Sequence, residues 1–441
     1  MIARRENEPP SAAARDDCPL PVVVQRRNIV CFVAFQCLYF LSAPVLYVGP
    51  VHANLLKTLG SSDTTANLPL SAYLWLTCTP LLAAWLFPRP RHLLPLISAG
   101  LCLMVAGTAA VALALGLGAA SGVVTVVVIA HGAIIGAANG VAITALWDCL
   151  RRGISTARRG VVLGFTFGIG PLFACGGALF QDALFEGRLL GGHTFGVAFP
   201  WNYAWMFAAV VPVLLLLVAT TRAFTLPDSA HEEAAPASPL AEIGAGFRQF
   251  ARHRAVWFAV LIYILVYSGG CAIIDNISLH AITVLGADTD TQGAQNFLRF
   301  GGKAVCGAAL GWLLASTSPR APLFATTALL LGGMVWALGV GGSWFLTVFA
   351  LLGAGGLFGA YFSNYITTAS AAPFVRVNLA ILSLLTPLVG FSPLAFGAIS
   401  DAHGRLASFQ VAAGVLVLAL ALIGLLPADP APRENSNLQS A

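Results

Sequence analysis

The chain has very few charged residues: among its 441 residues only 9% are Asp, Glu, Lys or Arg, whereas 58% are hydrophobic. Soluble globular domains usually carry about a quarter charged residues. The composition and the mean hydropathy of +0.83 therefore exclude an ordinary water-soluble protein. Lysine is almost absent, with 2 residues against 21 arginines, and this bias suggests a GC-rich, bacterial genome.

The motifs of several chemistries are also missing. The nine cysteines contain no CxxC pair, so neither a disulfide framework nor a metal cluster is expected. We find no phosphate-binding loop, no metal-ligand spacing and no nucleophile paired with a base. The sequence thus predicts no enzyme activity and no cofactor. The net charge of +5 comes mainly from loops between apolar segments, so no nucleic-acid partner is expected.

Long apolar runs dominate what remains. Runs of about 20 apolar residues span a bilayer as helices, and the absence of two-residue alternation excludes a barrel. The fold class is therefore an all-α polytopic membrane protein with twelve transmembrane helices. The expected spans are 28–48, 68–87, 93–117, 121–147, 160–184, 201–222, 255–284, 292–315, 321–340, 344–370, 377–399 and 407–426.

The distribution of cations predicts the orientation. With a cytoplasmic N-terminus, the inner segments hold eighteen Lys and Arg residues, including the run 151–159, whereas the outer segments hold only Lys57, Arg188 and Arg405. Lys and Arg are enriched on the cytoplasmic side, so we expect both termini to be cytoplasmic. The polar N-terminal tail precedes an uncleaved first span. We expect a multi-pass protein of the bacterial inner membrane.

The chain divides into two similar halves. The predicted parts are a cytoplasmic N-terminal tail (1–27), a six-helix bundle (28–222), a cytoplasmic linker (223–253), a second six-helix bundle (254–426) and a cytoplasmic C-terminal tail (427–441). Residues 26–60 parallel 253–286 at an offset close to 226, and "GAANGVAIT" at 136–144 parallels "GAYFSNYIT" at 359–367. An even number of spans per repeat makes the repeats parallel.

Six plus six spans, a linker and parallel halves resemble the major facilitator superfamily (MFS). The segment "GAISDAHGR" fits the family pattern G-x-x-x-D-x-x-G-R through Gly397, Asp401, Gly404 and Arg405, although it follows span 11. Between spans 2 and 3, where the pattern is most typical, "AWLFPRPRHLL" lacks its Gly and Asp. The resemblance implies an alternating-access transporter whose spans 1, 4, 7 and 10 line the cavity, with Asp401 and Arg405 as gating residues.

Three ionisable residues lie inside spans 7 and 8. Arg299 and Lys303 share one face of span 8, and Asp275 lies at a similar depth in span 7. A buried charge is costly unless it is paired, so we expect Asp275 to pair with one of the two cations and the other to bind an anionic group of the substrate. Asp275 is then the candidate site of proton coupling. Alternatively, the pair only locks the two helices together.

Other polar groups fall on the same spans. One face of span 1 carries Gln36 and Tyr39, span 4 carries Asn139, and span 10 carries Tyr361, Asn364 and Tyr365, which together are candidate substrate-binding residues. Such side chains could instead only join helices. His131 in span 4 could carry protons, although a packing role is also open, and His52 and His280 are expected to be solvated at outer ends.

The sequence therefore predicts a secondary transporter for a small polar, anionic or zwitterionic solute, with possible proton coupling. An exporter of amphiphilic or drug-like compounds is an alternative within the fold, since "GIGPLFACGG" in span 5 partly matches the antiporter motif of the family. A non-transporting membrane scaffold or sensor is another. The expected partners are the solute, the lipid bilayer and protons, and the expected oligomeric state is a monomer.

Overall fold

The computed structural model of the chain describes residues 18, 20–87, 89–186, 188–189, 192–193, 196–227, 247–248, 250–251, 253–286, 291–370 and 375–430. Nearly all of these residues are helical, and one short hairpin pairs β1 (Arg188–Leu189) antiparallel with β2 (Gly192–His193). Most of both predicted tails and of the predicted linker lies outside the described residues.

The helices follow the predicted spans closely. Those before the linker are α1 (Val22–Leu41), α2 (Ala43–Leu46), α3 (Pro50–Thr58), α4 (Asp63–Trp75), η1 (Leu76–Cys78), α5 (Thr79–Leu86), η2 (Pro90–His92), α6 (Leu93–Gly116), α7 (Ser121–Gly153), α8 (Thr156–Phe185) and α9 (Trp201–Arg222). Those after it are α11 (Arg254–Val266), η3 (Tyr267–Cys271), α12 (Ile274–Leu285), α13 (Gln292–Ser316), α14 (Arg320–Gly339), η4 (Gly342–Leu346), α15 (Thr347–Gly355), α16 (Phe358–Ala369), α17 (Val375–Leu385), η6 (Thr386–Gly390), α18 (Phe391–His403) and α19 (Arg405–Gly424).

Ten helical segments of the described chain are long and apolar enough to cross a membrane. They correspond to the predicted spans 3 to 12. The first two predicted spans, which are built from α1 to α3 and from α4 to α5, are not among these ten. The protein is thus an integral, multi-pass helical membrane protein, and the count of twelve spans stays a prediction.

The first predicted span is interrupted by its own sequence. The segment "SAPVLYVGPV" contains Pro44 and Pro50, and α2 ends before Tyr47 whereas α3 begins only at Pro50. Proline has no N–H to donate to the preceding turn, and it disfavours helical conformation in the residue before it, here Gly49. Residues 47–49 therefore lie in a non-helical break in the middle of the segment.

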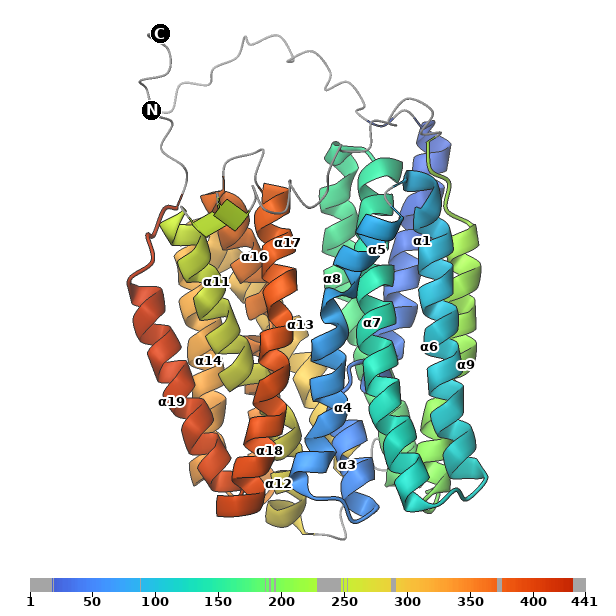
Figure 1. Cartoon of the computed structure of the whole chain (residues 1–441), viewed down its shortest axis with the longest axis vertical. Helices are drawn as coiled ribbons and strands as arrows, with labels where there is room; N and C mark the ends of the chain where they lie inside the picture. Colours follow the sequence, from blue (N-terminus) through green and yellow to red (C-terminus); the bar gives the residue numbers. More distant parts are fainter. Residues whose placement is uncertain are drawn as a thin grey trace.

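The helices form two groups (Figure 1). The buried apolar residues make two large clusters, of which one comes from helices α1 to α9 and the other from α11 to α19, each with a small contribution from the other group. In Figure 1, α6 and α9 lie at one edge and α14 and α19 at the opposite edge. Side chains such as Leu113 and Val335, which are 60% exposed, lie on these edge helices and would contact lipid.

Several pairs of helices join the two groups, among them α4 with η6 and the three that follow. Helix α4 packs against α18, α8 packs against α13, and α3 packs against α12. Two glycines permit the close approach, because a Cβ atom on Gly397 would lie 2.7 Å from Cα of Thr64, and one on Gly293 would lie 2.6 Å from Cα of Asp182. These contacts place the polar residues of both groups at a common interface.

Candidate functional site

Two cations lie in the middle of α13 and have no acidic partner among the described residues. Arg299 and Lys303 are partly buried and stand one helical turn apart on the same face. Nζ of Lys303 is 5.5 Å from the ring centroid of Tyr47 and 5.8 Å from that of Phe300, so it contacts an aromatic ring of the other helix group. Among the residues that the structure describes, no carboxylate forms an ion pair with either cation. We call Arg299 and Lys303 the central cations.

Glycines of the following helices fix the position of α13. A Cβ atom on Gly353 would overlap the carbonyl oxygen of Arg299, so α15 can pass this close only because residue 353 has no side chain. A Cβ atom on Gly356 would lie 3.4 Å from Cε of Lys303. The cations therefore project from a tightly packed helix pair and have little freedom to move away from the interface.

Asp275 is buried and unpaired. Its exposed fraction is 1%, and neither carboxylate oxygen has a hydrogen-bond partner within the described chain. The expected ion pair with Lys303 or Arg299 is thus not formed in this conformation. The physical reason is the direction of the side chain: Oδ1 lies 3.1 Å from the position of a Cβ atom on Gly49, so the carboxylate points across the interface toward the break in the first predicted span.

The polar residues of the first helix group include several unfilled hydrogen-bonding atoms. The hydroxyl of Tyr39 and Oδ1 of Asn139 are buried and have no partner among the described residues. Nδ2 of Asn139 lies 3.5 Å from the hydroxyl oxygen of Tyr73, a long hydrogen bond. Gln36, on the same helix as Tyr39, is also buried. The hydroxyl of Tyr39 and Oδ1 of Asn139 therefore have hydrogen-bonding capacity that no described residue uses.

The three residues predicted in span 10 lie in different surroundings. Tyr361 and Asn364 are partly exposed, as expected for residues lining a cavity. Tyr365 is fully buried, and its hydroxyl donates a 3.0 Å hydrogen bond to the carbonyl oxygen of Pro427, beyond the end of α19. Its polar atom is therefore already used inside the second helix group.

Two histidines form a buried pair. Nε2 of His52 lies 2.9 Å from Nδ1 of His131, and Nε2 of His131 lies 3.1 Å from Oγ1 of Thr108. The expectation that His52 is solvated was wrong, because it is only 1% exposed. His52 belongs to α3 (Pro50–Thr58), which follows the predicted first span, and most of this helix is buried. His280, partly exposed, lies between the rings of Phe345 and Phe409.

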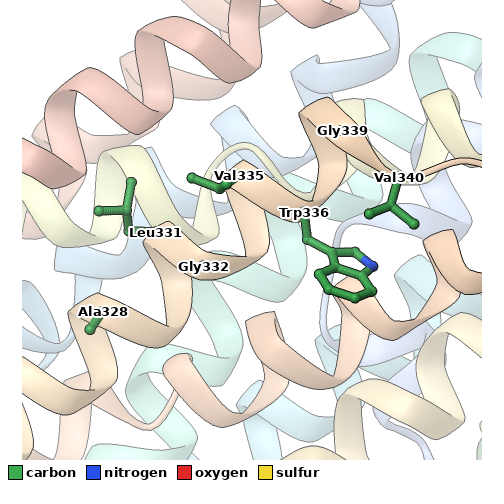
Figure 2. A pocket seen from close by; sticks show the side chains of 7 residues that line it. All are labelled: Ala328, Leu331, Gly332, Val335, Trp336, Gly339 and Val340. Carbon is green, nitrogen blue, oxygen red and sulfur yellow. The ribbon is translucent and has the colours of Figure 1, made fainter.

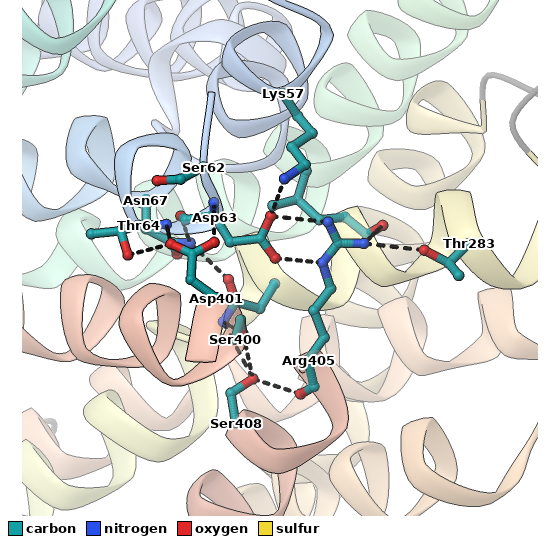
Figure 3. Close-up of polar contacts among 12 residues, drawn as sticks. Lys57, Ser62, Asp63, Thr64, Asn67, Thr283, Ser400, Asp401, Arg405 and Ser408 are labelled. Carbon is teal, nitrogen blue, oxygen red and sulfur yellow. Dashed lines mark hydrogen bonds and ion pairs between the residues drawn. The ribbon is translucent and has the colours of Figure 1, made fainter. Parts of the chain in front are cut away.

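A third polar cluster joins the two helix groups at one end of the molecule (Figure 3). Arg405 donates two hydrogen bonds to the carboxylate of Asp63, with distances of 2.6 Å from Nε to Oδ2 and 3.0 Å from Nη2 to Oδ1. Lys57 lies 2.6 Å from Oδ1 of the same carboxylate. Asp401 accepts hydrogen bonds of 2.8 and 2.9 Å from the backbone N–H groups of Asp63 and Thr64. We call these five residues the clasp.

The sequence pattern around the clasp explains its geometry. The N–H groups in the first turn of a helix have no partner within the helix, and Asp401 from α18 provides one for the first turn of α4. Gly397 allows α18 to approach α4 closely, and Gly404 has a positive φ of 82° that turns the chain before Arg405. Each defined position of the G-x-x-x-D-x-x-G-R pattern therefore contributes to one inter-helix contact.

Asp63 is the first residue of α4 and lies before the apolar segment 68–87. Burial alone would raise the pKa of this carboxyl group, but hydrogen bonds from Arg405 and Lys57 and the charges of these two cations outweigh it, so the pKa of Asp63 lies below its ordinary value. The carboxylate is consequently ionised at neutral pH, and it is paired with both cations.

An apolar hollow lies on α14, away from these polar groups (Figure 2). It is lined by Ala328, Leu331, Gly332, Val335, Trp336, Gly339 and Val340. None of these side chains is charged, and α14 lies at an edge of the molecule (Figure 1). The hollow has no group that could bind a polar solute.

Sequence reasoning missed several residues of these clusters. Asp63 directly follows Ser62, whose side chain caps α4, and this capping signal marked the helix start without indicating a partner. Tyr73 lies in a predicted span but was not selected. For Gly49 the only signal in the sequence is the neighbouring Pro50 in "VGPV", which indicates a break in the helix. The role of each of these three residues depends on a contact with a residue that is distant in the sequence.

Comparison with known proteins identifies the fold. No family model and no curated protein matches the chain. Among solved structures, a bacterial homologue of the human lysosomal transporter Spinster, inward-facing and unoccupied, matches with a TM-score of 0.67 at 16% identity, over 92% of this chain and 98% of that one. A D-xylose-proton symporter matches with a TM-score of 0.65 at 14% identity, over 91% and 98% of the two chains.

The fucose:proton symporter FucP of E. coli, described as an MFS transporter, matches in its outward conformation with a TM-score of 0.56 at 16% identity, over 91% of this chain and 100% of that one. All three matches extend over nine-tenths of the chain, so they include both helix groups and the interface between them. The chain therefore has the fold of the major facilitator superfamily transporters.

Proposed function

We propose that the protein is a secondary transporter that moves a small polar, anionic or zwitterionic solute by alternating access. The observation that carries this proposal is the pair of central cations without an acidic partner among the described residues. Keeping two cations unpaired in a membrane protein costs free energy, which an anionic ligand would recover. Arg299 offers a planar fork suited to a carboxylate, and Lys303 a point charge.

The side chains opposite the cations suit the remainder of such a solute. Tyr39 and Asn139 hold buried hydrogen-bonding atoms without a partner among the described residues, and Tyr361 and Asn364 are partly exposed. We assign these four residues and Gln36 to the solute site. Tyr365 is left out because its hydroxyl is bonded to Pro427.

The clasp supports alternating access. It joins the two helix groups at the end where α3 and α12 terminate, so the solute cannot leave through that end while the clasp is closed (Figure 3). Asp401 and Arg405 thus act as gating residues together with Asp63. We assign this end to the outside of the cell, because Arg26, Arg27, Arg151 and Arg152 belong to the opposite end and cations are enriched on the cytoplasmic side. Both termini are then cytoplasmic, in a monomer in a bacterial inner membrane.

Asp275 is the coupling residue in this proposal. A buried carboxylate without a partner is unfavourable, so in this conformation it must bind a proton or another cation. Departure of that cation leaves a negative charge facing the break in the first span and within electrostatic range of Arg299. That charge would compete with the anionic solute for the cation. The solute and the coupling cation are therefore expected to bind together.

The test is a ligand screen of the purified protein by thermal shift, followed by uptake into proteoliposomes. We expect a carboxylate or zwitterion to stabilise the wild type and to lose this effect in Arg299→Gln or Lys303→Gln. Arg151→Gln, which removes an exposed cation outside both the site and the clasp, is the matched control and should keep the response. Stabilisation by neutral or cationic compounds alone, unchanged in both central variants, would contradict the proposed substrate class.

Coupling has its own test. In Asp275→Asn the side chain keeps its volume but cannot ionise, so we expect solute exchange to continue while accumulation driven by a cation gradient is lost. Undiminished gradient-driven uptake in this variant would show that the coupling residue lies elsewhere.

A further inference from the structure

The break at residues 47–49 faces Asp275 across the interface between the two helix groups. Counted back from the end of the matched segments, where Gly60 corresponds to Gly286 at an offset of 226 residues, Gly49 aligns with Asp275. One half thus places a carboxylate where the other half has no side chain. The two positions are also in direct contact, because a Cβ atom on Gly49 would lie 3.1 Å from Oδ1 of Asp275.

The same point is also close to a backbone oxygen. The carbonyl oxygen of Tyr47 lies 3.6 Å from the position of a Cβ atom on Gly49. Within the described chain, the carbonyl oxygens of Leu46, Tyr47 and Val48 accept no hydrogen bond. Pro50 explains part of this, since it stands where a helix would place the N–H that bonds to Leu46, and proline has none.

The side chains next to these carbonyl groups are apolar. Leu46 is fully buried, Val48 is 6% exposed, and the side chain of Ile274 lies 3.9 Å from the same point. Oxygen atoms without donors in an apolar site are unfavourable unless they bind a cation or water. In membrane transporters, carbonyl groups of unwound helix segments are a known source of ligands for Na⁺.

We propose that Asp275 and the carbonyl groups of Leu46, Tyr47 and Val48, at the break between α2 and α3, form a binding site for one Na⁺ ion between the two helix groups. This inference rests on the proposed function, in which Asp275 is the coupling residue, and it names the cation. A single carboxylate favours a monovalent ion, because a divalent one would leave excess positive charge beside Arg299. Na⁺ and a proton compete for the same carboxylate.

The test measures Na⁺ binding directly, without the solute. Purified protein is titrated with NaCl, KCl or choline chloride at constant ionic strength, and both the melting temperature and the binding of radioactive Na⁺ are recorded. We expect Na⁺ to stabilise the wild type more than choline or K⁺, and acidification to displace it. Asp275→Asn should abolish the response. Gly49→Ala should weaken Na⁺ binding at least about tenfold, because its methyl group occupies the proposed ion position while the carboxylate is kept.

Asp182→Asn is the matched control, since Asp182 is a carboxylate at the interface between the two helix groups but outside the site, and it should respond as the wild type does. An equal effect of Na⁺ and choline on the wild type, or an unchanged response in Gly49→Ala and Asp275→Asn, would overturn the Na⁺ site. Solute transport that depends on Asp275 but not on Na⁺ would overturn it too, yet leave the proposed transporter intact with a proton as its coupling ion.

Discussion

The clasp and the central site use similar residues in opposite ways. In the clasp, Asp63 is paired with Arg405 and Lys57, and Asp401 accepts hydrogen bonds from the first turn of α4. In the central site, Arg299, Lys303 and Asp275 have neither an ion pair nor, for Asp275, a hydrogen bond among the described residues. Paired charges hold two elements together, whereas unpaired ones are left for a ligand.

Because of this difference, substitutions in the clasp and in the central site should affect stability and function differently. Removing one partner of a paired cluster leaves the other uncompensated, so the contact between the helix groups should weaken. Removing an unpaired buried charge relieves a desolvation cost, so the fold should gain stability while binding is lost. Substitutions in the two regions should therefore change melting temperature and transport in different combinations.

The largest effect is expected at the central cations. Arg299→Gln and Lys303→Gln should each weaken binding of the anionic solute by about 2–5 kcal/mol, the usual cost of removing one partner of a buried charged contact, and should raise the melting temperature without ligand. Calorimetric binding and thermal unfolding measure the two quantities on the same sample. A variant that loses stability and keeps affinity would show that the cation is structural.

The next effect is expected at the clasp. Asp63→Asn or Arg405→Gln removes a pair whose side chains are 6% and 18% exposed, so its loss should cost between the ~1 kcal/mol of an exposed pair and the ~4 kcal/mol of a buried one. A shift of about 2 kcal/mol changes the ratio of two conformations roughly 30-fold. The distance between spin labels at Thr58 and His403 should therefore increase.

The control for the clasp is a charged pair that lies within one helix and does not join the two helix groups. Arg151 pairs with Asp148 within α7, and its side chain is 58% exposed. Arg151→Gln should leave the distance between the labels unchanged. An equal change in this control and in Arg405→Gln would mean that the labels report general loosening of the protein and not opening of the clasp.

A smaller effect is expected at the histidine pair. Its partners are all in the first helix group, so His131→Gln should destabilise the protein by about 1–3 kcal/mol, the cost of leaving a buried polar group unsatisfied. Solute affinity and coupling should be unchanged. Loss of proton-driven uptake at an unchanged melting temperature would instead support the role in proton transfer that the sequence leaves open for His131.

The positions of the helices could be predicted from the sequence because the length of an apolar run is a local property. The predicted span 201–222 coincides with α9 (Trp201–Arg222), and 292–315 differs from α13 by one residue. The helix α3 beyond the first predicted span (28–48) was not predicted, because it contains polar residues such as His52 and Asn54. Each of these makes one hydrogen bond to a distant residue, His52 to His131 and Asn54 to Ser278.

The candidate site could be predicted only in part. A charged residue within an apolar run is visible locally, and Asp275, Arg299 and Lys303 were selected in this way. Whether such charges pair depends on side-chain direction across the interface, which one sequence does not contain. Asp63 and Arg405 are separated by 342 residues, so neither could be assigned to the other from spacing.

The smallest expected effect concerns pH, to which the clasp and the central site should respond differently. The pKa of Asp63 lies below its ordinary value, so the clasp contributes its full stabilisation above the ordinary carboxyl pKa of about 4 and loses it only as the pH falls through the lowered pKa. Between pH 8 and 5 the Asp63 carboxylate therefore stays ionised. In Asp275→Asn the distance between labels at Thr58 and His403 should stay constant over this range, and a pH dependence that only the wild type shows in it would come from Asp275. Opening of the clasp between pH 7 and 5 in Asp275→Asn would show that its own charges titrate there, and the division between paired and unpaired charges would then no longer explain how the protein responds to protons.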